Sequence, residues 1–289
     1  MAEGAHADQR PGTAPAVDAP SASTPLTERS SRVVVARKLT RRVGRDRAGA
    51  FLAEGARAVG EALAAHSAGR FRVREVFATA ERAGRLQTPA GVPVRTVMDK
   101  AAASLSETVT PQGLVAVCEL PAVTAADALA QRPALVAVLL GVSDPGNAGT
   151  VVRVADAAGA GAVLFAGDTV DPYNGKAVRA STGSLFHLPV ARDRDAIGVL
   201  RACRDAGLRL VGADGHARDD VDTAAVQGEL STPTAWVFGS EAHGLPPEVS
   251  AELDTSLRVP IYGDAESLNL ATAAAVCLYG SARARRHGR

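Results

Sequence analysis

The sequence predicts an α/β protein, with an open parallel sheet in its C-terminal part and a smaller α/β domain before it. The run Leu135–Leu140 is apolar at every position, which is typical of a strand buried on both faces of a parallel sheet. From this run onward, strand patterns alternate with helix patterns, the order that builds parallel sheets. A chain of 289 residues with 46% hydrophobic residues can also fill two cores.

The first 31 residues are expected to form a disordered tail. Four prolines stand here among Ala, Ser and Thr. Large apolar side chains are too few in this segment to offset the entropy lost on ordering.

Residues 32–121 predict a small three-layer domain, because short strand and helix patterns alternate in it. Phe51–Ala56 leads into an alanine-rich helix, Arg57–His66. A linker is expected over residues 122–133, helical in part through Thr124–Gln131. The remaining elements of the domain are strands at Val73–Phe77, Val92–Val94 and Leu114–Val117 and a helix at Met98–Ala103.

Residues 134–289 predict the second domain. The strand Leu135–Leu140 is followed by a polar loop, Gly141–Gly149, by a helix over Thr150–Ala158 and by a strand over Ala162–Phe165. Its further elements are strands at Leu208–Val211, Thr234–Phe238 and Ser256–Pro260 and helices at Arg194–Asp205 and Leu268–Ser281.

The glycines disfavour two nucleotide-binding folds. Gly159 and Gly161, with Gly167 nearby, close a helix and precede a strand. A dinucleotide-binding fingerprint, or that of an ordinary Rossmann-type methyltransferase, needs its glycines after a strand and at the start of a helix. The sequence also lacks a phosphate-binding loop of the P-loop type.

Basic residues gather between Arg32 and Arg47, where Asp46 is the single acid. Such a run can lie along RNA phosphates, and it can equally be the solvated face of a helix. The residues that we expect to contact RNA in the first case are Arg37, Lys38, Arg41, Arg42 and Arg45.

The three cysteines, Cys118, Cys203 and Cys277, are far apart in the chain, and buried reduced thiols are expected. No Cys or His pair has the spacing of metal ligands, so no metal is expected. The sequence shows neither a signal peptide nor an apolar run of membrane-spanning length. These features predict a cytoplasmic protein with no membrane partner.

Three segments carry the functional signal. They are Asp144–Arg153, Val237–Pro246, and Val259–Tyr262 leading to Ser267–Leu270. In order, spacing and polar residues, they resemble the three motifs of the SpoU (TrmH-type) RNA ribose methyltransferases of the SPOUT superfamily. The residues before them, Phe51–Gly55 and Thr110–Gly113, resemble the substrate-binding domain of many SpoU enzymes, which is related to ribosomal protein L30e.

The resemblance implies a homodimeric enzyme that transfers a methyl group from S-adenosylmethionine to a ribose 2′-hydroxyl of structured RNA. It also implies a deep trefoil knot in the C-terminal sheet, a rare exception to unthreaded topology. The expected substrate is 23S ribosomal RNA, with transfer RNA as the nearest competitor. Similarity to a group that includes avilamycin-type resistance enzymes suggests a role in antibiotic resistance. A non-catalytic RNA-binding or ribosome-assembly factor is a different class of hypothesis. All five polar residues of the motifs are present, which argues against it.

By the same resemblance, Arg153 is the catalytic arginine. An arginine, whose pKa exceeds 12, is a poor base, so either the site lowers its pKa or Arg153 holds a phosphate that helps to accept the proton. Asn147 is expected beside Arg153, and Glu241 is expected to orient it. Without the resemblance to the family, the alternative interpretations are that Arg153 is an exposed helix residue, Asn147 a turn residue and Glu241 a helix-start carboxylate.

Ser267 and Asn269 are expected to organise the catalytic face. Independently of the family, the sequence predicts Ser267 as the N-cap of the last helix and Asn269 as a residue of its first turn. Family enzymes contact the cofactor largely through backbone atoms, which small residues allow. The residues that match those contacts are Gly239, Val259, Ile261, Leu268 and, more weakly, Ala213. Some relatives have an arginine where this chain has Thr182, so a substrate contact there is in doubt.

Overall fold

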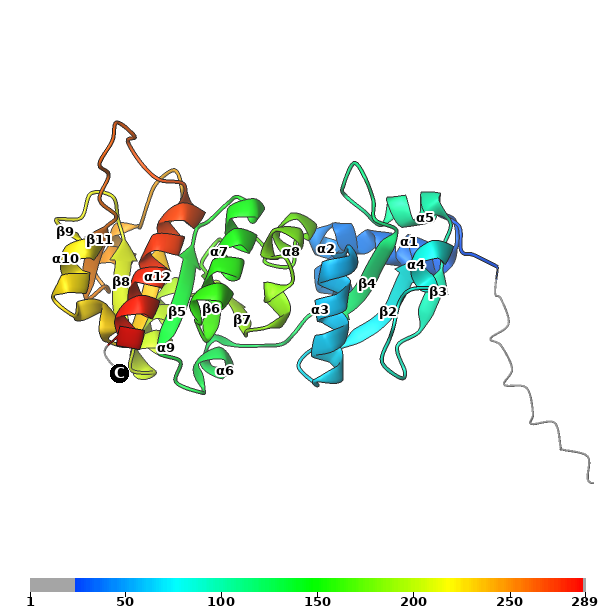
Figure 1. Cartoon of the computed structure of the whole chain (residues 1–289), viewed down its shortest axis with the longest axis horizontal. Helices are drawn as coiled ribbons and strands as arrows, with labels where there is room; N and C mark the ends of the chain where they lie inside the picture. The colour runs from blue at the N-terminus through cyan, green and yellow to red at the C-terminus, as the bar shows by residue number, and fades with distance from the viewer. Residues whose placement is uncertain (1–23, 288–289) are drawn as a thin grey trace, which may run out of the picture.

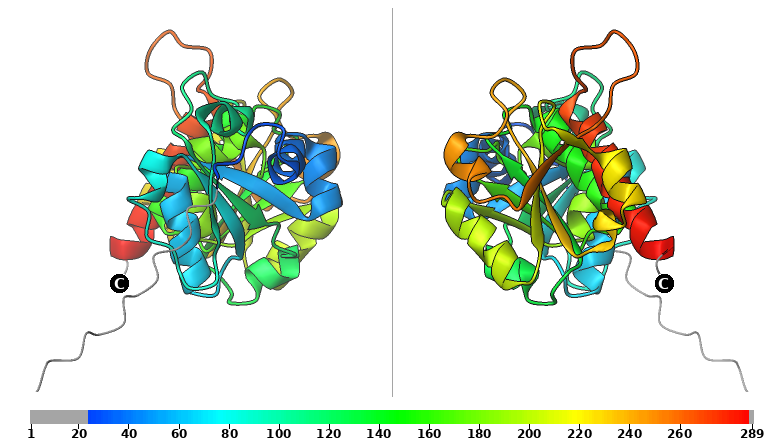
Figure 2. Two further views of the ribbon diagram at one scale, coloured as in Figure 1. Left: turned by 90° about the vertical axis from the view of Figure 1, so that its right-hand side faces the viewer. Right: turned by 90° about the vertical axis from the view of Figure 1, so that its left-hand side faces the viewer.

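The computed structural model describes residues 24–287 and places two domains side by side along the long axis (Figure 1). Each domain has one sheet, and the end-on views of Figure 2 show helices on both faces. The first sheet has four strands and the second has seven. An α/β fold with a large C-terminal sheet and a smaller N-terminal domain is thereby confirmed.

The N-terminal sheet has the order β1-β4-β2-β3, in which β4 runs antiparallel to the other three strands. Helix α3 covers one face, and α1, η1 and α5 cover the other, so the domain has three layers as predicted. Its elements are α1 (Ser31–Arg37), the 3-10 helix η1 (Lys38–Thr40), α2 (Arg42–Ala48), β1 (Ala50–Glu54), α3 (Ala56–Ser67), β2 (Val73–Ala78), α4 (Ala80–Ala83), β3 (Val94–Thr96), α5 (Asp99–Ser104) and β4 (Leu114–Glu119).

The predicted tail is too long at its C-terminal end. Leu26 donates its amide to Thr96 at 2.8 Å and accepts the amide of Met98 at 2.9 Å, so it extends the sheet edge beside β3. A single apolar side chain among Ser, Thr and Pro gave no strand pattern in the sequence. Residues 1–23 of the predicted tail lie outside the described part.

The C-terminal sheet is parallel throughout, with the order β7-β6-β5-β10-β8-β11-β9. All six residues of β5 are buried, as the apolar run predicted. Every strand end that carries a motif lies at the same edge, because parallel strands all point the same way. The strands are β5 (Leu135–Leu140), β6 (Ala162–Ala166), β7 (Val190–Asp193), β8 (Arg209–Ala213), β9 (Asp219–Asp220), β10 (Thr234–Phe238) and β11 (Thr255–Arg258).

Two layers of helices enclose this sheet. Helices α7, α10 and α12 bury their apolar faces against one side, and α6, α9 and α11 against the other. The indole of Trp236 in β10 donates to the hydroxyl of Ser281 in α12 at 2.9 Å, which satisfies both buried polar groups. The helices are α6 (Ala125–Leu129), α7 (Pro145–Ala158), α8 (Gly175–Ser181), η2 (Ser184–Phe186), α9 (Ala196–Asp205), α10 (Val221–Val226), η3 (Glu229–Ser231), α11 (Pro247–Ser250) and α12 (Leu270–His287).

Helix α7 begins earlier than predicted. Residues 145–149 were expected in a loop, but Asp144 caps the helix by accepting the amide of Asn147 at 2.8 Å, and Pro145 takes the first helical position. This pair is a strong helix start, since proline loses no hydrogen bond there. The Pro-Gly-Asn sequence instead suggested a turn. Asn147 therefore sits on a rigid helix.

The two domains share one apolar cluster. The ring of Phe51 in β1 lies 4.8 Å from that of Tyr173 and 6.1 Å from that of Phe186, both in the C-terminal domain. Beside them, Arg45 in α2 donates through Nε and Nη2 to one carboxylate oxygen of Asp171, at 2.9 and 2.7 Å. This ion pair is buried, and Arg45 also donates to the backbone carbonyl of Leu39. The domains are thus held in one orientation.

All three cysteines are buried and free, as predicted. Burial raises the pKa of Cys203 and of Cys277 to about 12, which keeps these thiols protonated and unreactive. Among residues 24–287, no helix is long and apolar enough to cross a membrane.

Candidate active site

The three motif segments all follow strands at the carboxyl edge of the parallel sheet. The first follows β5, the second follows β10 and the third follows β11, and β10 pairs with β5 and with β8. The segment between β11 and α12, orange in Figure 1, projects beyond this edge. Ligands of open α/β sheets bind at such edges.

A chain of side-chain hydrogen bonds joins the three segments. The amide nitrogen of Asn147 donates to the carboxylate of Glu241 at 2.9 Å. The amide oxygen of Asn147 accepts from the amide nitrogen of Asn269 at 3.0 Å. These side chains are at the surface of the carboxyl edge, where a substrate can reach them. The structure brings together three of the five predicted catalytic residues, and Asn147 is the link between the other two.

Glu241 lies in the turn Ser240–Gly244, so its alternative interpretation as a helix-start residue is wrong. Besides Asn147, it accepts the backbone amide of Ser143 at 3.4 Å. Partial burial acts to raise the pKa of Glu241, but the hydrogen bonds from Asn147 and from backbone amides outweigh it and lower the pKa. Glu241 is therefore an ionised acceptor at neutral pH.

Arg153 lies apart from the hydrogen-bonded side chains of Glu241, Asn147 and Asn269. Its guanidinium donates to the hydroxyl of Thr182 at 3.4 Å and pairs with no carboxylate of residues 24–287. Within one chain Glu241 bonds to Asn147 and not to Arg153, so its role in orienting Arg153 stays a prediction. An exposed guanidinium with no partner charge suits an anion from outside the chain. Thr182, whose contact with the substrate was in doubt, is the direct neighbour of Arg153.

Asn269, rather than Ser267, caps α12. Its side-chain oxygen accepts the amides of Ala271 at 2.9 Å and of Thr272 at 3.4 Å. Ser267 is exposed and makes no hydrogen bond with the described residues, so its expected capping role is wrong. Because one Asn269 side chain holds both the helix and Asn147, the start of α12 is fixed to the start of α7.

Ala213, Gly239 and Val259 lie at the carboxyl ends of three neighbouring strands. Phe238 in β10 and Leu257 in β11 both pair with Ala213 in the sheet. A Cβ on Gly239 would collide with the backbone carbonyl of Gly244, so only glycine fits there. Ile261 and Leu268 expose 39% and 37% of their surface, which leaves apolar side chains on the rim. An adenine-containing cofactor is expected to bind along this backbone and its apolar rim.

Comparison with known proteins agrees with this geometry. A profile of the SpoU rRNA Methylase family matches residues 134–279. The chain is 33% identical over 246 residues to the 23S rRNA (guanosine(2553)-2'-O)-methyltransferase RlmP of Bacillus subtilis, covering 84% of this chain and 92% of that protein. This chain belongs to the SpoU rRNA methylase family.

Solved SpoU-type structures match both domains. An AdoMet-bound rRNA methyltransferase from Sinorhizobium meliloti has a TM-score of 0.78 at 31% identity, covering 91% of this chain and 98% of that one. AviRb from Streptomyces viridochromogenes, in complex with AdoMet, has a TM-score of 0.76 at 31% identity, covering 90% of this chain and all of that one (100%). The N-terminal residues 31–116 match the MRM3-like substrate binding domain. The trefoil knot stays an expectation of the SpoU fold.

The structure separates the basic run of this SpoU protein into exposed and buried members. Arg37, Lys38 and Arg41 are exposed and have no carboxylate partner among residues 24–287, whereas Arg42 pairs with Asp46 at 3.8 Å. The prediction that Arg45 contacts RNA is wrong, because its side chain is buried against Asp171. Among the same residues, no group of three side chains could hold a metal ion.

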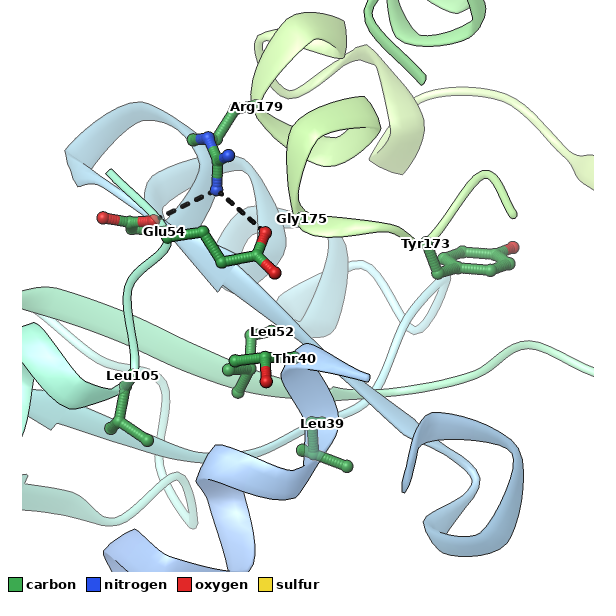
Figure 3. A pocket seen from close by; sticks show the side chains of 9 residues that line it. Leu39, Thr40, Leu52, Glu54, Leu105, Tyr173, Gly175 and Arg179 are labelled. Atoms are coloured by element: carbon green, nitrogen blue, oxygen red, sulfur yellow. Dashed lines mark hydrogen bonds and ion pairs between the residues drawn. The ribbon is translucent and has the colours of Figure 1, made fainter. Parts of the chain in front are cut away.

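The SpoU domain also meets the substrate-binding domain in a pocket that sequence reasoning missed. Arg179 in α8 reaches across to Glu54 at 3.3 Å and to Glu107 at 3.7 Å, above an apolar floor that includes Leu52 and Leu105 (Figure 3). A wider cleft of about 290 Å³ adjoins it and is lined by Arg57, Thr182 and their neighbours. The acids and bases that form this junction are far apart in the chain, so no local pattern marks them.

His187 forms a second link between the domains and should make stability depend on pH. Its ring nitrogens lie 2.6 Å from Asp156 and 3.1 Å from Glu61 of the other domain. Burial acts to lower the pKa of His187, but the hydrogen bonds and charges of Asp156 and Glu61 outweigh it and raise the pKa.

The charged His187 therefore stabilises the fold below its unfolded pKa of about 6.5, and this contribution is lost as the pH rises through the higher folded pKa. We expect the melting temperature to fall between about pH 6 and pH 8 by more in the native protein than in His187→Gln. Thermal unfolding across this range measures it. Equal pH profiles for the two proteins would contradict the assignment.

Proposed function

We propose that this SpoU enzyme transfers a methyl group from S-adenosylmethionine to a ribose 2′-hydroxyl of 23S ribosomal RNA. The observation that carries the proposal is the hydrogen-bonded chain from Glu241 through Asn147 to Asn269 at the carboxyl edge, beside the backbone that fits the cofactor. Similarity to RlmP over 84% of the chain supports 23S RNA rather than transfer RNA.

The residues of this chain position the acceptor and help to remove its proton. When bound, S-adenosylmethionine supplies an electrophilic methyl group on a sulfonium. The carboxylate of Glu241 fixes the amide of Asn147, so the polar face is set before RNA arrives. Arg153 holds an RNA phosphate next to the acceptor ribose, and the hydroxyl proton passes to water as the ribose oxygen takes the methyl group. No metal takes part in this scheme.

Tritium transfer tests the proposal. The enzyme is incubated with labelled S-adenosylmethionine and unmodified 23S, 16S and transfer RNA, and the labelled nucleotide is mapped. We expect label in one ribose of 23S RNA. Label only in transfer RNA would overturn the substrate, and label in none of the RNAs would favour a non-catalytic RNA-binding factor.

A role in antibiotic resistance is proposed on the likeness to AviRb, which extends over 90% of this chain. The test is expression in a susceptible bacterium, followed by growth on ribosome-targeting antibiotics of several classes. Protection that depends on Arg153 would support the role. No protection against any class would overturn it and leave the methyl transfer intact.

We further propose a homodimer. Exposed apolar side chains gather on the segment before α12 and on α12 itself, among them Tyr262 with 88% and Tyr279 with 42% exposed. Burying them against a second copy would remove apolar surface from water. Sedimentation should give a mass near twice the chain mass of 29.5 kDa. A monomer that is fully active would contradict the proposal.

The exposed basic residues should contribute to RNA affinity. Replacing Arg37, Lys38 and Arg41 by Ala should reduce the slope of log affinity against log salt by about two units, since each phosphate contact contributes about 0.7 to 0.9. Fluorescence anisotropy with 23S RNA fragments at several salt concentrations measures it. An unchanged slope would mean that these residues form only a solvated helix face.

A further inference from the structure

Two arginines from different domains converge on one residue. Arg57, in the first turn of α3, donates its Nε–H to the carbonyl oxygen of Thr182 at 3.2 Å. Arg153, on α7, donates to the hydroxyl of the same Thr182 at 3.4 Å. Sequence reasoning assigned no role to Arg57.

Both arginines keep their charge available. Neither pairs with a carboxylate of residues 24–287, and both are exposed. The cleft beside Thr182 is lined by Arg57 and by Arg179, and Arg179 differs from the other two arginines because Glu54 and Glu107 neutralise it. The positive charge beside Thr182 therefore comes from Arg57 and Arg153, and an anion placed there would meet two guanidinium groups.

Thr182 is held in an unusual conformation. It ends α8 with a φ of 52°, in the left-handed region that β-branched residues rarely occupy. Such backbone strain persists where the surrounding structure enforces it, and it is often found at functional sites. Here this conformation turns the carbonyl and the hydroxyl of one residue toward the two arginines.

The cleft beside this pair has the size and lining for one nucleotide. Its volume of about 290 Å³ is close to the lower end of the range of ligand sites, which begins at about 300 Å³. Thr108, Thr110 and Gln112 line it with hydroxyl and amide groups that can bond to a sugar or a base edge.

We infer that the cleft between the domains is a substrate subsite, in which a nucleotide flanking the methylated one sits with its phosphate between Arg57 and Arg153. The inference rests on the proposed function, because it takes RNA as the substrate. Arg57 thus becomes a binding residue supplied by the substrate-binding domain. It ties the position of that domain to the position of the acceptor ribose.

Kinetics of Arg57→Ala test the subsite. With 23S RNA transcribed in vitro, KM for RNA should rise about tenfold or more, the effect of losing a hydrogen bond to a charged group. The value of kcat should fall less, and the Kd of S-adenosylmethionine should not change. The salt slope of RNA binding should decrease by about 0.7 to 0.9. Arg57→Lys should keep the slope and recover part of KM.

Arg201→Ala is the matched control, because Arg201 is equally exposed and unpaired but lies on α9, on the opposite face. It should leave KM and the salt slope unchanged. In RNA binding, Arg57→Ala and Arg153→Ala should be non-additive if both hold one phosphate. Native KM and slope in Arg57→Ala would overturn the subsite. If the native enzyme methylates no RNA but Arg57→Ala still weakens RNA binding, the function fails and the subsite stands.

Discussion

Arg153→Ala is expected to lower methyl transfer by at least about a hundredfold, the lower end of the range for groups that assist proton transfer. The physical reason is that Arg153 has an exposed guanidinium beside Thr182 with no carboxylate partner among residues 24–287, so it can pair with a substrate phosphate. Its removal breaks one long hydrogen bond to Thr182, so the fold should be kept. The measurement is tritium transfer under single-turnover conditions.

Two further measurements make the result for Arg153 specific. Arg153→Lys should also fail, because a point ammonium cannot replace a planar fork. Calorimetry should give an unaltered Kd for S-adenosylmethionine in both variants. Turnover close to that of the native enzyme, in either variant, would rule out a role for Arg153 in the reaction.

Arg45→Ala is expected to destabilise the protein by about 3 to 5 kcal/mol, the cost of leaving one partner of a buried ion pair uncompensated. Asp171 would lose both hydrogen bonds from the guanidinium, at 2.9 and 2.7 Å, and would remain buried. Urea denaturation measures the free energy of unfolding.

The matched control for Arg45 is Arg42→Ala, whose exposed pair with Asp46 at 3.8 Å should contribute less than about 1 kcal/mol. The double variant Arg45→Ala with Asp171→Ala should recover part of the loss, since no charge is then left buried alone. A cost for Arg45→Ala as small as that of Arg42→Ala would show that the ion pair does not stabilise the junction.

The contrast between Arg42 and Arg45 shows where sequence reasoning reaches its limit. Both stand in one basic run, and a local pattern gives them the same expected role. They differ because Arg45 donates to the carboxylate of Asp171, which is 126 residues away along the chain, and to the carbonyl of Leu39. A buried cation inside a basic run can be recognised only once its distant partner is placed.

The parts of the fold that were predicted are those in which composition alone decides the environment. The strand β5 is apolar at every position because helices cover both of its faces, and that pattern is visible in six residues. Elements at the edge of the sheet are harder to predict from the sequence. Strand β7 has only two buried residues of four, and helix α8 contains no leucine, isoleucine or phenylalanine, so neither gave a clear pattern.

The motifs led to the candidate catalytic residues, but not to the contact between Glu241 and Asn147. Glu241 was assigned to Arg153, and it bonds to Asn147. The start of α7 at Pro145 explains the difference, because it turns Asn147 into a helix residue that faces the next two segments. A motif lists the residue types of a site, whereas the helix start decides which of them touch.

The contact of Phe51 with Tyr173 and Phe186 has a consequence for how such proteins can be recombined. The covalent boundary between the domains lies near residue 120, but the aromatic rings that complete the first domain belong to residues 173 and 186 of the second. A chimera cut at the covalent boundary would pair a foreign ring surface with Phe51. The exchangeable module of this architecture is therefore discontinuous: the N-terminal domain together with the segment from Asp171 to Phe186, transplanted as a single graft.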